Sequence, residues 1–133
     1  MVPKFKAWNG YKKIMADYVS AIQNGDTKGT PSSVNVIVNG KNETWNVKND
    51  HVKLLQFTGL KDVNGKEIYV GDIVKYHNLD DKYQYLPIIW LDQDCLVSAG
   101  GYRIDIVTRR CEVIGNIHEN PELLEAQHDT RTD

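Results

Sequence analysis

The sequence of 133 residues has only two cysteines, Cys95 and Cys111, and no long apolar segment. Two isolated cysteines are too few for a disulfide scaffold and too isolated for a zinc site. No window approaches the ~18 apolar residues that a membrane-spanning helix needs. Residues 1–15 also lack the apolar core of a signal peptide. These absences predict a soluble, cytoplasmic protein that does not contact a membrane.

An excess of charge of either sign is also missing. Sixteen Lys and Arg stand against eighteen Asp and Glu, which gives a net charge of −2. A dedicated non-specific nucleic-acid-binding protein should carry a clear basic excess, so this class is disfavoured. The length fits one domain that can bury a sizeable core.

Motifs that carry catalysis are absent as well. No Gly-x-Ser-x-Gly, phosphate-binding glycine loop or Cys-x-x-Cys occurs in the chain. Four histidines lie far apart without ligand spacing, namely His51, His77, His118 and His128. Cys95 or Cys111 could act as a nucleophile with a distant histidine, but a buried free thiol is the simpler interpretation. Asp92 and Asp94 fit a turn. The sequence therefore predicts no enzyme, no cofactor and no metal site.

The first 50 residues predict a strand, a helix and a hairpin. Residues 4–8 alternate polar and apolar side chains, as a half-buried strand does. Ile14, Tyr18 and Ile22 recur at four-residue intervals and predict a helix over residues 12–23, although Tyr18 would also suit a strand. Two β-branched or aromatic runs flank an Asn-Gly turn and predict a hairpin over residues 34–47.

Residues 51–118 predict several short strands separated by glycine-bearing turns, including strands over 103–108 and 111–117. This pattern is typical of a small barrel, and we expect an SH3-like β-barrel. Asn120 as N-cap and Pro121 at the first helical position predict a short helix over residues 120–126. The fold class is thus mainly β, with a minor helical part. We expect one domain over residues 1–125. Its N-terminal part covers residues 1–50, its barrel core covers residues 51–118, and the short helix follows. A flexible tail is expected over residues 127–133.

Three stretches together resemble the YopX family of phage and prophage proteins. They are residues 5–8 (Phe-Lys-Ala-Trp), 55–76 (Leu-Gln-Phe-Thr-Gly through Gly-Asp-Ile-Val-Lys-Tyr) and 113–124 (Val-Ile-Gly-Asn-Ile-His-Glu-Asn-Pro-Glu-Leu-Leu). Their order and spacing also agree with the family. The resemblance implies a phage or prophage origin, a bacterial host cell and a β-rich fold, and it supplies no mechanism. His118 stands where the family commonly has Tyr.

The residues that carry this resemblance are explained by backbone geometry. Asn64-Gly65 fits a type I′ turn, and Asp62 can accept hydrogen bonds from that turn. A calcium loop is the functional alternative, since Asp62, Asn64 and Glu67 supply oxygens at short spacing. An EF-hand needs Glu where this chain has Ile73. We therefore assign structural roles to Trp8, Gly59, Asp62, Asn64, Gly65, Gly71, Asp72, Gly115, Asn120 and Pro121.

A binding surface is expected at the junction between the last strand and the C-terminal helix. Asn116, His118 and Glu119 are polar and lie in a loop on a rigid scaffold, where binding residues are common. Seven Tyr and three Trp also offer interface anchors. We therefore predict a non-enzymatic phage accessory protein that binds another protein or associates with itself through an edge strand.

The alternative is a nucleic-acid-associated phage factor. Small β-barrels can combine basic and aromatic residues to contact phosphates and stack on bases. Two groups of residues offer this combination in the sequence: Lys4, Lys6, Lys12 and Lys13 with Trp8 and Tyr11, and Arg103, Arg109 and Arg110 with Tyr102. The acidic residues weaken this alternative, because they dilute the positive field.

Overall fold

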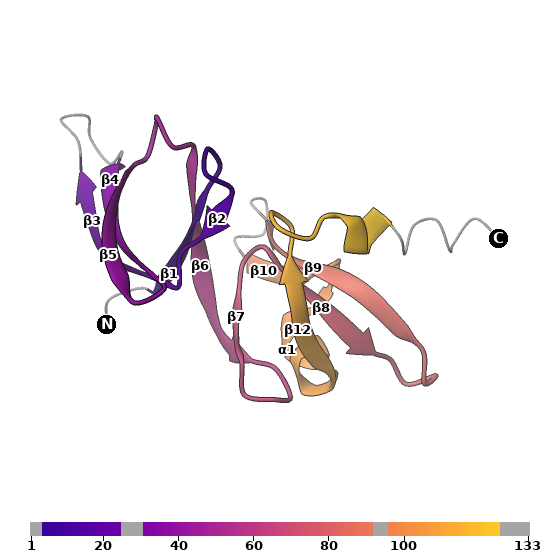
Figure 1. Cartoon of the computed structure of the whole chain (residues 1–133). Coiled ribbons are helices and arrows are strands. Elements are labelled where there is room, and N and C mark those ends of the chain that lie inside the picture. The colour runs from indigo at the N-terminus through magenta and orange to yellow at the C-terminus, as the bar shows by residue number, and fades with distance from the viewer. Residues whose placement is uncertain (1–3, 25–30, 92–95, 126–133) are drawn as a thin grey trace. The chain divides into compact units, whose positions relative to one another are not determined.

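The computed structural model describes residues 4–24, 31–91 and 96–125 (Figure 1). It confirms a mainly β protein built from antiparallel strands. The chain divides into two compact units, with the boundary between Gln56 and Phe57. The sequence predicted one domain over residues 1–125, with an N-terminal part that ends at residue 50. Strand β6 (Val52–Lys61) crosses the boundary, and the two units are described separately below.

The first unit consists of short antiparallel strands. They are β1 (Phe5–Asn9), β2 (Ile14–Met15), β3 (Tyr18–Asn24), β4 (Pro31–Val38), β5 (Lys41–Asn46) and the first part of β6. β1 pairs with β2 on one side and with β6 on the other, and a separate three-stranded sheet has the order β3-β4-β5. The strand predicted over residues 4–8 is therefore confirmed as β1.

The hairpin predicted over residues 34–47 is confirmed as β4 and β5. Its turn places Asn39 at φ 51° and Gly40 at φ 78°. A type I′ turn requires positive φ at both central residues, and Asn-Gly adopts this conformation at the lowest cost. The turn chemistry thus sets the register in which Val34 lies opposite Trp45.

The helix predicted over residues 12–23 is wrong, because this segment forms β2 and β3. β3 pairs along its length with β4, so that Val19 lies opposite Val36 and Ile22 opposite Val34. The four-residue spacing does not mark one buried face, since Tyr18 is 52% exposed. Pairing with a neighbouring strand outweighs a weak helical pattern in a segment rich in β-branched and aromatic side chains.

The core of the first unit surrounds one tryptophan. Trp45 is fully buried, and the other buried members of this cluster are Ala7, Ala16, Val34, Val36 and Val52. The indole Nε1–H of Trp45 donates a hydrogen bond to Glu43 Oε1 at 2.9 Å. This bond lowers the pKa of the Glu43 carboxyl from its ordinary value, and Lys12 lowers it further. The ring therefore fills the core while its polar atom keeps a partner.

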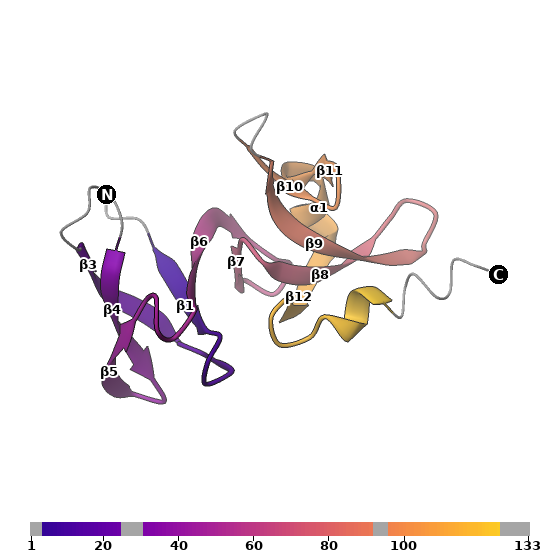
Figure 2. The same ribbon diagram turned by 90° about the horizontal axis from the view of Figure 1, so that it is seen from above.

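The second unit contains a five-stranded antiparallel sheet in the order β11-β10-β9-β8-β12 (Figure 2). Its elements are β7 (Glu67–Tyr69), β8 (Asp72–His77), β9 (Tyr83–Leu91), β10 (Leu96–Ala99), β11 (Tyr102–Arg103), α1 (Ile104–Val107), a 3₁₀ turn (Thr108–Arg110) and β12 (Cys111–Asn116). β7 pairs with the second part of β6. Buried side chains of the sheet, of β7 and of α1 form a second core cluster around Ile68, Val74 and Ile88.

The strand predicted over residues 103–108 is wrong after Arg103, since residues 104–107 form α1 and Thr108 begins the 3₁₀ turn. Ile104 and Val107 stand three residues apart, so one helical turn places both on the same face. Val107 is fully buried in the second core, and Ile104 packs against it. A strand would direct these two side chains to opposite faces. The predicted strand at 111–117 is confirmed as β12.

The chain after β12 turns into a short helix, with residues 122–125 helical inside the predicted range 120–126. The carbonyl of Asn120 accepts a hydrogen bond from Leu123 N–H at 3.2 Å. Its side-chain Oδ1 accepts from Asn116 N–H at 3.2 Å, so the side chain connects the helix start to β12. The predicted tail at 127–133 and residue 126 lie outside the described residues. No helix among the described residues is long and apolar enough to cross a membrane.

Candidate functional site

The three-stranded sheet of the first unit has two edges, and one of them is blocked. β5 carries the charged residues Lys41 and Glu43 along this edge. The carboxylate of Asp50 accepts the Asn46 N–H at 3.0 Å, which occupies one of the outward backbone donors. Charges and occupied donors on an edge prevent it from pairing with another strand. β5 is therefore poorly suited to bind an extended chain.

The opposite edge, β3, has no strand paired on its outer side among the described residues. β3 contains no charged residue, and every residue except Val19 is exposed. β1 lies near β3, but β1 pairs with β2 and β6. Two register shifts interrupt the pairing of β3 with β4. Near one of them the Ser20 hydroxyl donates a hydrogen bond to the Asn35 carbonyl oxygen at 3.1 Å. An uncharged edge of seven residues presents backbone donors and acceptors to a partner strand.

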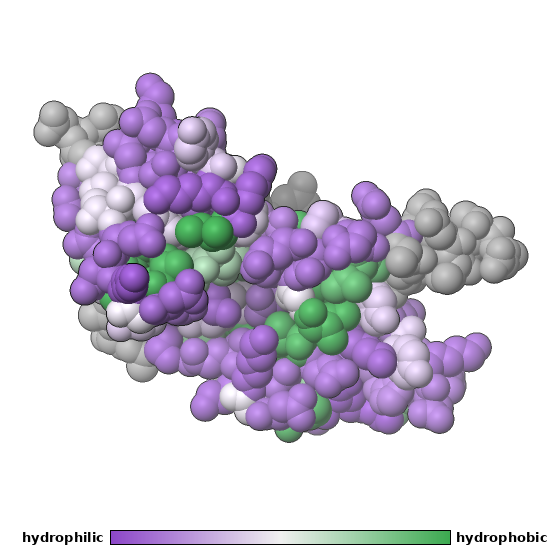
Figure 3. All heavy atoms as spheres, viewed as in Figure 1, coloured by the Kyte–Doolittle hydropathy of each residue, from purple (hydrophilic) through white to green (hydrophobic). Residues whose placement is uncertain are grey.

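β3 also carries large exposed side chains. Tyr18 is 52% exposed and Ile22 is 38% exposed. The face of the molecule in Figure 3 is largely hydrophilic, with small separate hydrophobic areas. Aromatic and aliphatic side chains beside unpaired backbone groups provide the anchors that protein interfaces use.

The turn at residues 62–66 blocks an edge of the second unit. Asp62 is buried, and its Oδ1 accepts hydrogen bonds from Asn64 N–H (2.8 Å) and Lys66 N–H (2.9 Å). Its Oδ2 accepts from Val113 N–H on β12 at 2.9 Å. Burial raises the pKa of the Asp62 carboxyl, but the three backbone donors outweigh burial and hold it below its ordinary value. The Asp62 carboxylate thus joins the turn to the outer side of β12.

This turn differs from the predicted type I′ geometry. Gly65 has φ 83°, whereas Asn64 is not among the residues with positive φ. The Asn64 N–H and the Lys66 N–H both donate to the Asp62 side chain, which adds to the backbone bonds of the turn from Gly65 N–H to Asp62 O (3.0 Å) and from Asp62 N–H to Lys66 O (2.9 Å). Both carboxylate oxygens of Asp62 are therefore engaged by backbone donors. Within the described ranges, no group of three or more His, Cys, Asp or Glu side chains could hold a metal ion.

The predicted binding residues after β12 form a local turn. Asn116 Oδ1 accepts hydrogen bonds from His118 N–H (3.0 Å) and Glu119 N–H (2.8 Å). Asn116 Nδ2 donates to Glu119 Oε1 at 2.8 Å. These bonds explain why Asn116 and Glu119 occur here without a ligand. A binding role for the three residues stays a prediction.

Gly115 permits the close approach of the Asn120 side chain. A Cβ atom added at position 115 would lie 2.5 Å from Asn120 Oδ1 and 2.8 Å from its Cγ. We expect Gly115→Ala to lower the free energy of unfolding by about 2 kcal/mol, because overpacking at this site forces a shift. Urea denaturation measures this loss. In an Asn120→Gly background the same substitution should cost much less, and an equal cost in both backgrounds would contradict the contact.

The other motif residues occupy structural positions. Gly59 has φ 86° and Gly71 has φ 100°, conformations that glycine adopts without strain. Asp72 is buried, and its Oδ2 accepts a hydrogen bond from Tyr69 N–H at 2.8 Å. Trp8 is also buried, and Pro121 directly precedes the C-terminal helix.

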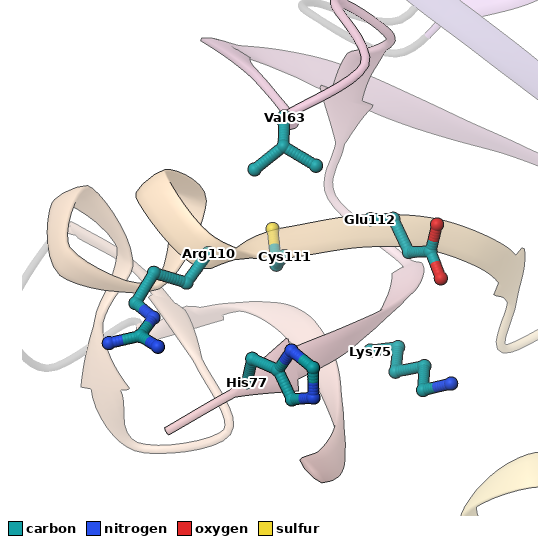
Figure 4. A pocket seen from close by; sticks show the side chains of 6 residues that line it. All are labelled: Val63, Lys75, His77, Arg110, Cys111 and Glu112. Atoms are coloured by element: carbon teal, nitrogen blue, oxygen red, sulfur yellow. The ribbon is translucent and has the colours of Figure 1, made fainter. Parts of the chain in front are cut away.

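A pocket of about 230 Å³ opens on the second unit beside β8 and β12 (Figure 4). It is lined by Val63, Lys75, His77, Arg110, Cys111 and Glu112. Lys75 and His77 alternate along β8, and Glu112 lies opposite Lys75 in the register of β12. The sequence singled out Arg110 and Cys111 for other reasons and did not predict this pocket. The two-residue spacing of Lys75 and His77 was the available signal.

The thiol of Cys111 is buried at this pocket. Burial raises its pKa to about 12, and the negative charges of Asp62 and Glu112 act in the same direction. A thiol that stays protonated at neutral pH is a poor nucleophile, so Cys111 fits the expected buried free thiol. The other candidates, Cys95, Asp92 and Asp94, lie outside the described residues.

The basic residues proposed for nucleic-acid contacts are partly engaged elsewhere. Trp8 is only 7% exposed and cannot stack on a base. Lys12 forms an ion pair with Glu43 at 3.5 Å, and Arg103 forms one with Asp105 at 2.9 Å. These contacts weaken the two clusters that the sequence suggested.

Comparison with known proteins gives one family, and the similar solved structures include the two described below. The model of the YopX protein family matches residues 4–125. The crystal structure of protein EF1440 from Enterococcus faecalis is similar, with 29% identity and a TM-score of 0.67 over 93% of this chain and 99% of that chain. The structure of protein yopX from Bacillus subtilis is similar at 20% identity, with a TM-score of 0.57 over 91% of this chain and 97% of that chain. No curated protein matches this sequence.

Proposed function

Because the chain belongs to the YopX family, we propose that it is a non-enzymatic accessory protein of phage or prophage origin that binds another protein through β3. The open, uncharged edge of β3 is the observation that supports this proposal. A partner strand added to this edge would form backbone hydrogen bonds, and Tyr18 and Ile22 would add side-chain contacts. The partner is a second protein or a second copy of this chain, in the cytoplasm of the bacterial host.

The SH3-like β-barrel expected over residues 51–118 is part of the same proposal. Five antiparallel strands with β12 at one edge support it. An experimental structure superposed on SH3 barrels would test it directly. A sheet that stays open, with no barrel-like strand order, would contradict it.

Affinity capture from lysogenic or infected host cells tests the β3 proposal when wild type is compared with Ala21→Lys. Ala21 is exposed on β3, and a lysine on an edge strand blocks pairing. We expect Ala21→Lys to lose about tenfold or more of partner binding, because edge pairing joins many hydrogen bonds in one contact. If the partner is a second copy of this chain, light scattering should show that Ala21→Lys loses self-association.

Asn42→Lys is the matched control for this experiment. Asn42 is exposed on β5, the blocked edge of the same sheet, and receives the same charge. It should bind the partner as wild type does. Equal binding by Ala21→Lys and wild type would contradict the proposal, provided that circular dichroism shows both variants folded.

The rival function is a nucleic-acid-associated factor. Arg109 and Arg110 are exposed next to each other, and the Lys75 Nζ lies 4.1 Å from the Tyr83 ring centroid. Basic and aromatic side chains in proximity can contact a nucleic-acid strand. A filter-binding assay at two salt concentrations separates the two functions. Binding that weakens steeply with salt would favour the rival.

A further inference from the structure

Three basic side chains from two elements meet at the pocket of the second unit. Lys75 and His77 project from β8, and Arg110 ends the 3₁₀ turn before β12. In Figure 4 Cys111 and His77 lie at the centre of the lining, Arg110 extends to one side of them and Lys75 to the other, and Val63 faces Cys111 from the turn at 62–66. Basic groups gathered around a concave space define a site for an anion.

Tyr83 on β9 positions two of these basic groups. It lies opposite His77 in the register of β8 and β9, and the two ring centroids are 4.9 Å apart. The Lys75 Nζ lies 4.1 Å from the Tyr83 centroid, within the range of a cation–π contact. One aromatic ring therefore restrains both β8 side chains at the pocket.

The cations of the pocket have no protein counter-ion among the described residues. Lys12 and Arg103 each form an ion pair with a carboxylate, whereas no such pair involves Lys75 or Arg110 in the described part of the chain. Glu112 is the one acidic residue of the lining, and it lies opposite Lys75. The buried Cys111 thiol stays protonated and adds no negative charge. The lining thus has a positive excess.

We propose that this pocket binds the phosphate group of a small phosphomonoester. The planar guanidinium of Arg110 can donate two parallel hydrogen bonds to phosphate oxygens. Lys75 supplies a second full charge, and His77 a ring nitrogen, from the other strand. A phosphate with two negative charges gains from both cations, while Glu112 in the lining and the nearby Asp62 carboxylate repel it. This site lies on the second unit and is independent of the β3 edge.

An NMR titration of the full chain tests the site with three probes: inorganic phosphate, O-phosphoserine and adenosine monophosphate. We expect saturable shifts confined to the amides of residues 75–77 and 110–112. The relative affinity of phosphoserine and the nucleotide then identifies the source of the phosphate. Shifts that do not saturate, or that spread over the whole chain, would overturn the proposal.

Arg110→Ala should weaken phosphate binding about tenfold, since a charge-assisted bidentate contact is lost. Arg109→Ala is the matched control, because Arg109 is the adjacent exposed arginine and does not line the pocket. It should retain the wild-type affinity. An equal loss in both variants would indicate general electrostatic attraction and would overturn the site.

Glu112→Gln gives a result that damage to the fold cannot imitate. Removing the one carboxylate of the lining should raise the phosphate affinity about threefold, because a repulsive charge disappears. An unchanged or lower affinity would contradict the proposed position of the phosphate. A single-stranded oligonucleotide without terminal phosphate that binds this pocket more tightly than the monoesters would overturn the proposal in favour of nucleic-acid binding.

Discussion

Replacing Asp62 with alanine is expected to lower the free energy of unfolding by about 3 kcal/mol, because three backbone N–H groups in partly buried hydrogen bonds lose their acceptor. The donors belong to Asn64, Lys66 and Val113, at 2.8–2.9 Å. The loss separates the 62–66 turn from β12. Urea denaturation measures the change, and Asp80→Ala in the exposed β8–β9 turn is the control, with little expected effect.

The same carboxylate makes stability depend on pH. Its pKa lies below the ordinary value of 3.8, so the folded state binds the proton less readily than the unfolded state does. The ionised carboxylate therefore contributes fully to the free energy of unfolding above pH 3.8. This contribution is lost as the pH falls through the lower pKa of the folded state. Wild type should lose more stability than Asp62→Ala in this acidic range. Parallel pH profiles for the two proteins would contradict the role of the charge.

Replacing Trp45 with alanine is expected to cost about 4 kcal/mol, since removing a fully buried indole leaves a cavity in the first core. The ring packs among Val34, Val36 and their neighbours, and its Nε1–H loses the bond to Glu43. Thermal or urea unfolding measures the loss. Tyr11→Ala is the control because Tyr11 is 72% exposed. A cost near 1 kcal/mol would show that the cavity closes by relaxation.

Local chemistry explains the parts of the fold that the sequence predicted correctly. The hairpin at 34–47 depends on Asn39 and Gly40, which adopt positive φ at low cost. β1 and β12 follow from alternating apolar residues, and the family motifs fall on β6, β8 and β12. In these segments the information lies within a few residues of the chain.

The errors occurred where a distant partner decides the local structure. Residues 12–23 have a helical spacing, but β4 provides a strand to pair with. Residues 103–108 have strand-like composition, but one helical turn brings Ile104 and Val107 together on the second core. The local pattern of residues in one sequence does not show which distant segment a strand will pair with or which core a side chain will pack against.

The two surfaces that support the proposals also depend on long-range register. Lys75 and Glu112 are far apart in the sequence and lie opposite each other only because β8 pairs with β12. Arg110 reaches the pocket from the 3₁₀ turn, which replaces a predicted strand. Binding through an edge strand was expected in general terms, but the choice of β3 for the proposal required the sheet order.

Amide hydrogen exchange of the captured complex tests the central claim most directly. The exchange of residues 18–24 should slow on complex formation, because the outward N–H groups of β3 gain acceptors. Residues 41–46 of β5 should exchange as in the free protein. Protection confined to β5 or to the pocket of the second unit, with β3 unchanged, would contradict binding through the β3 edge.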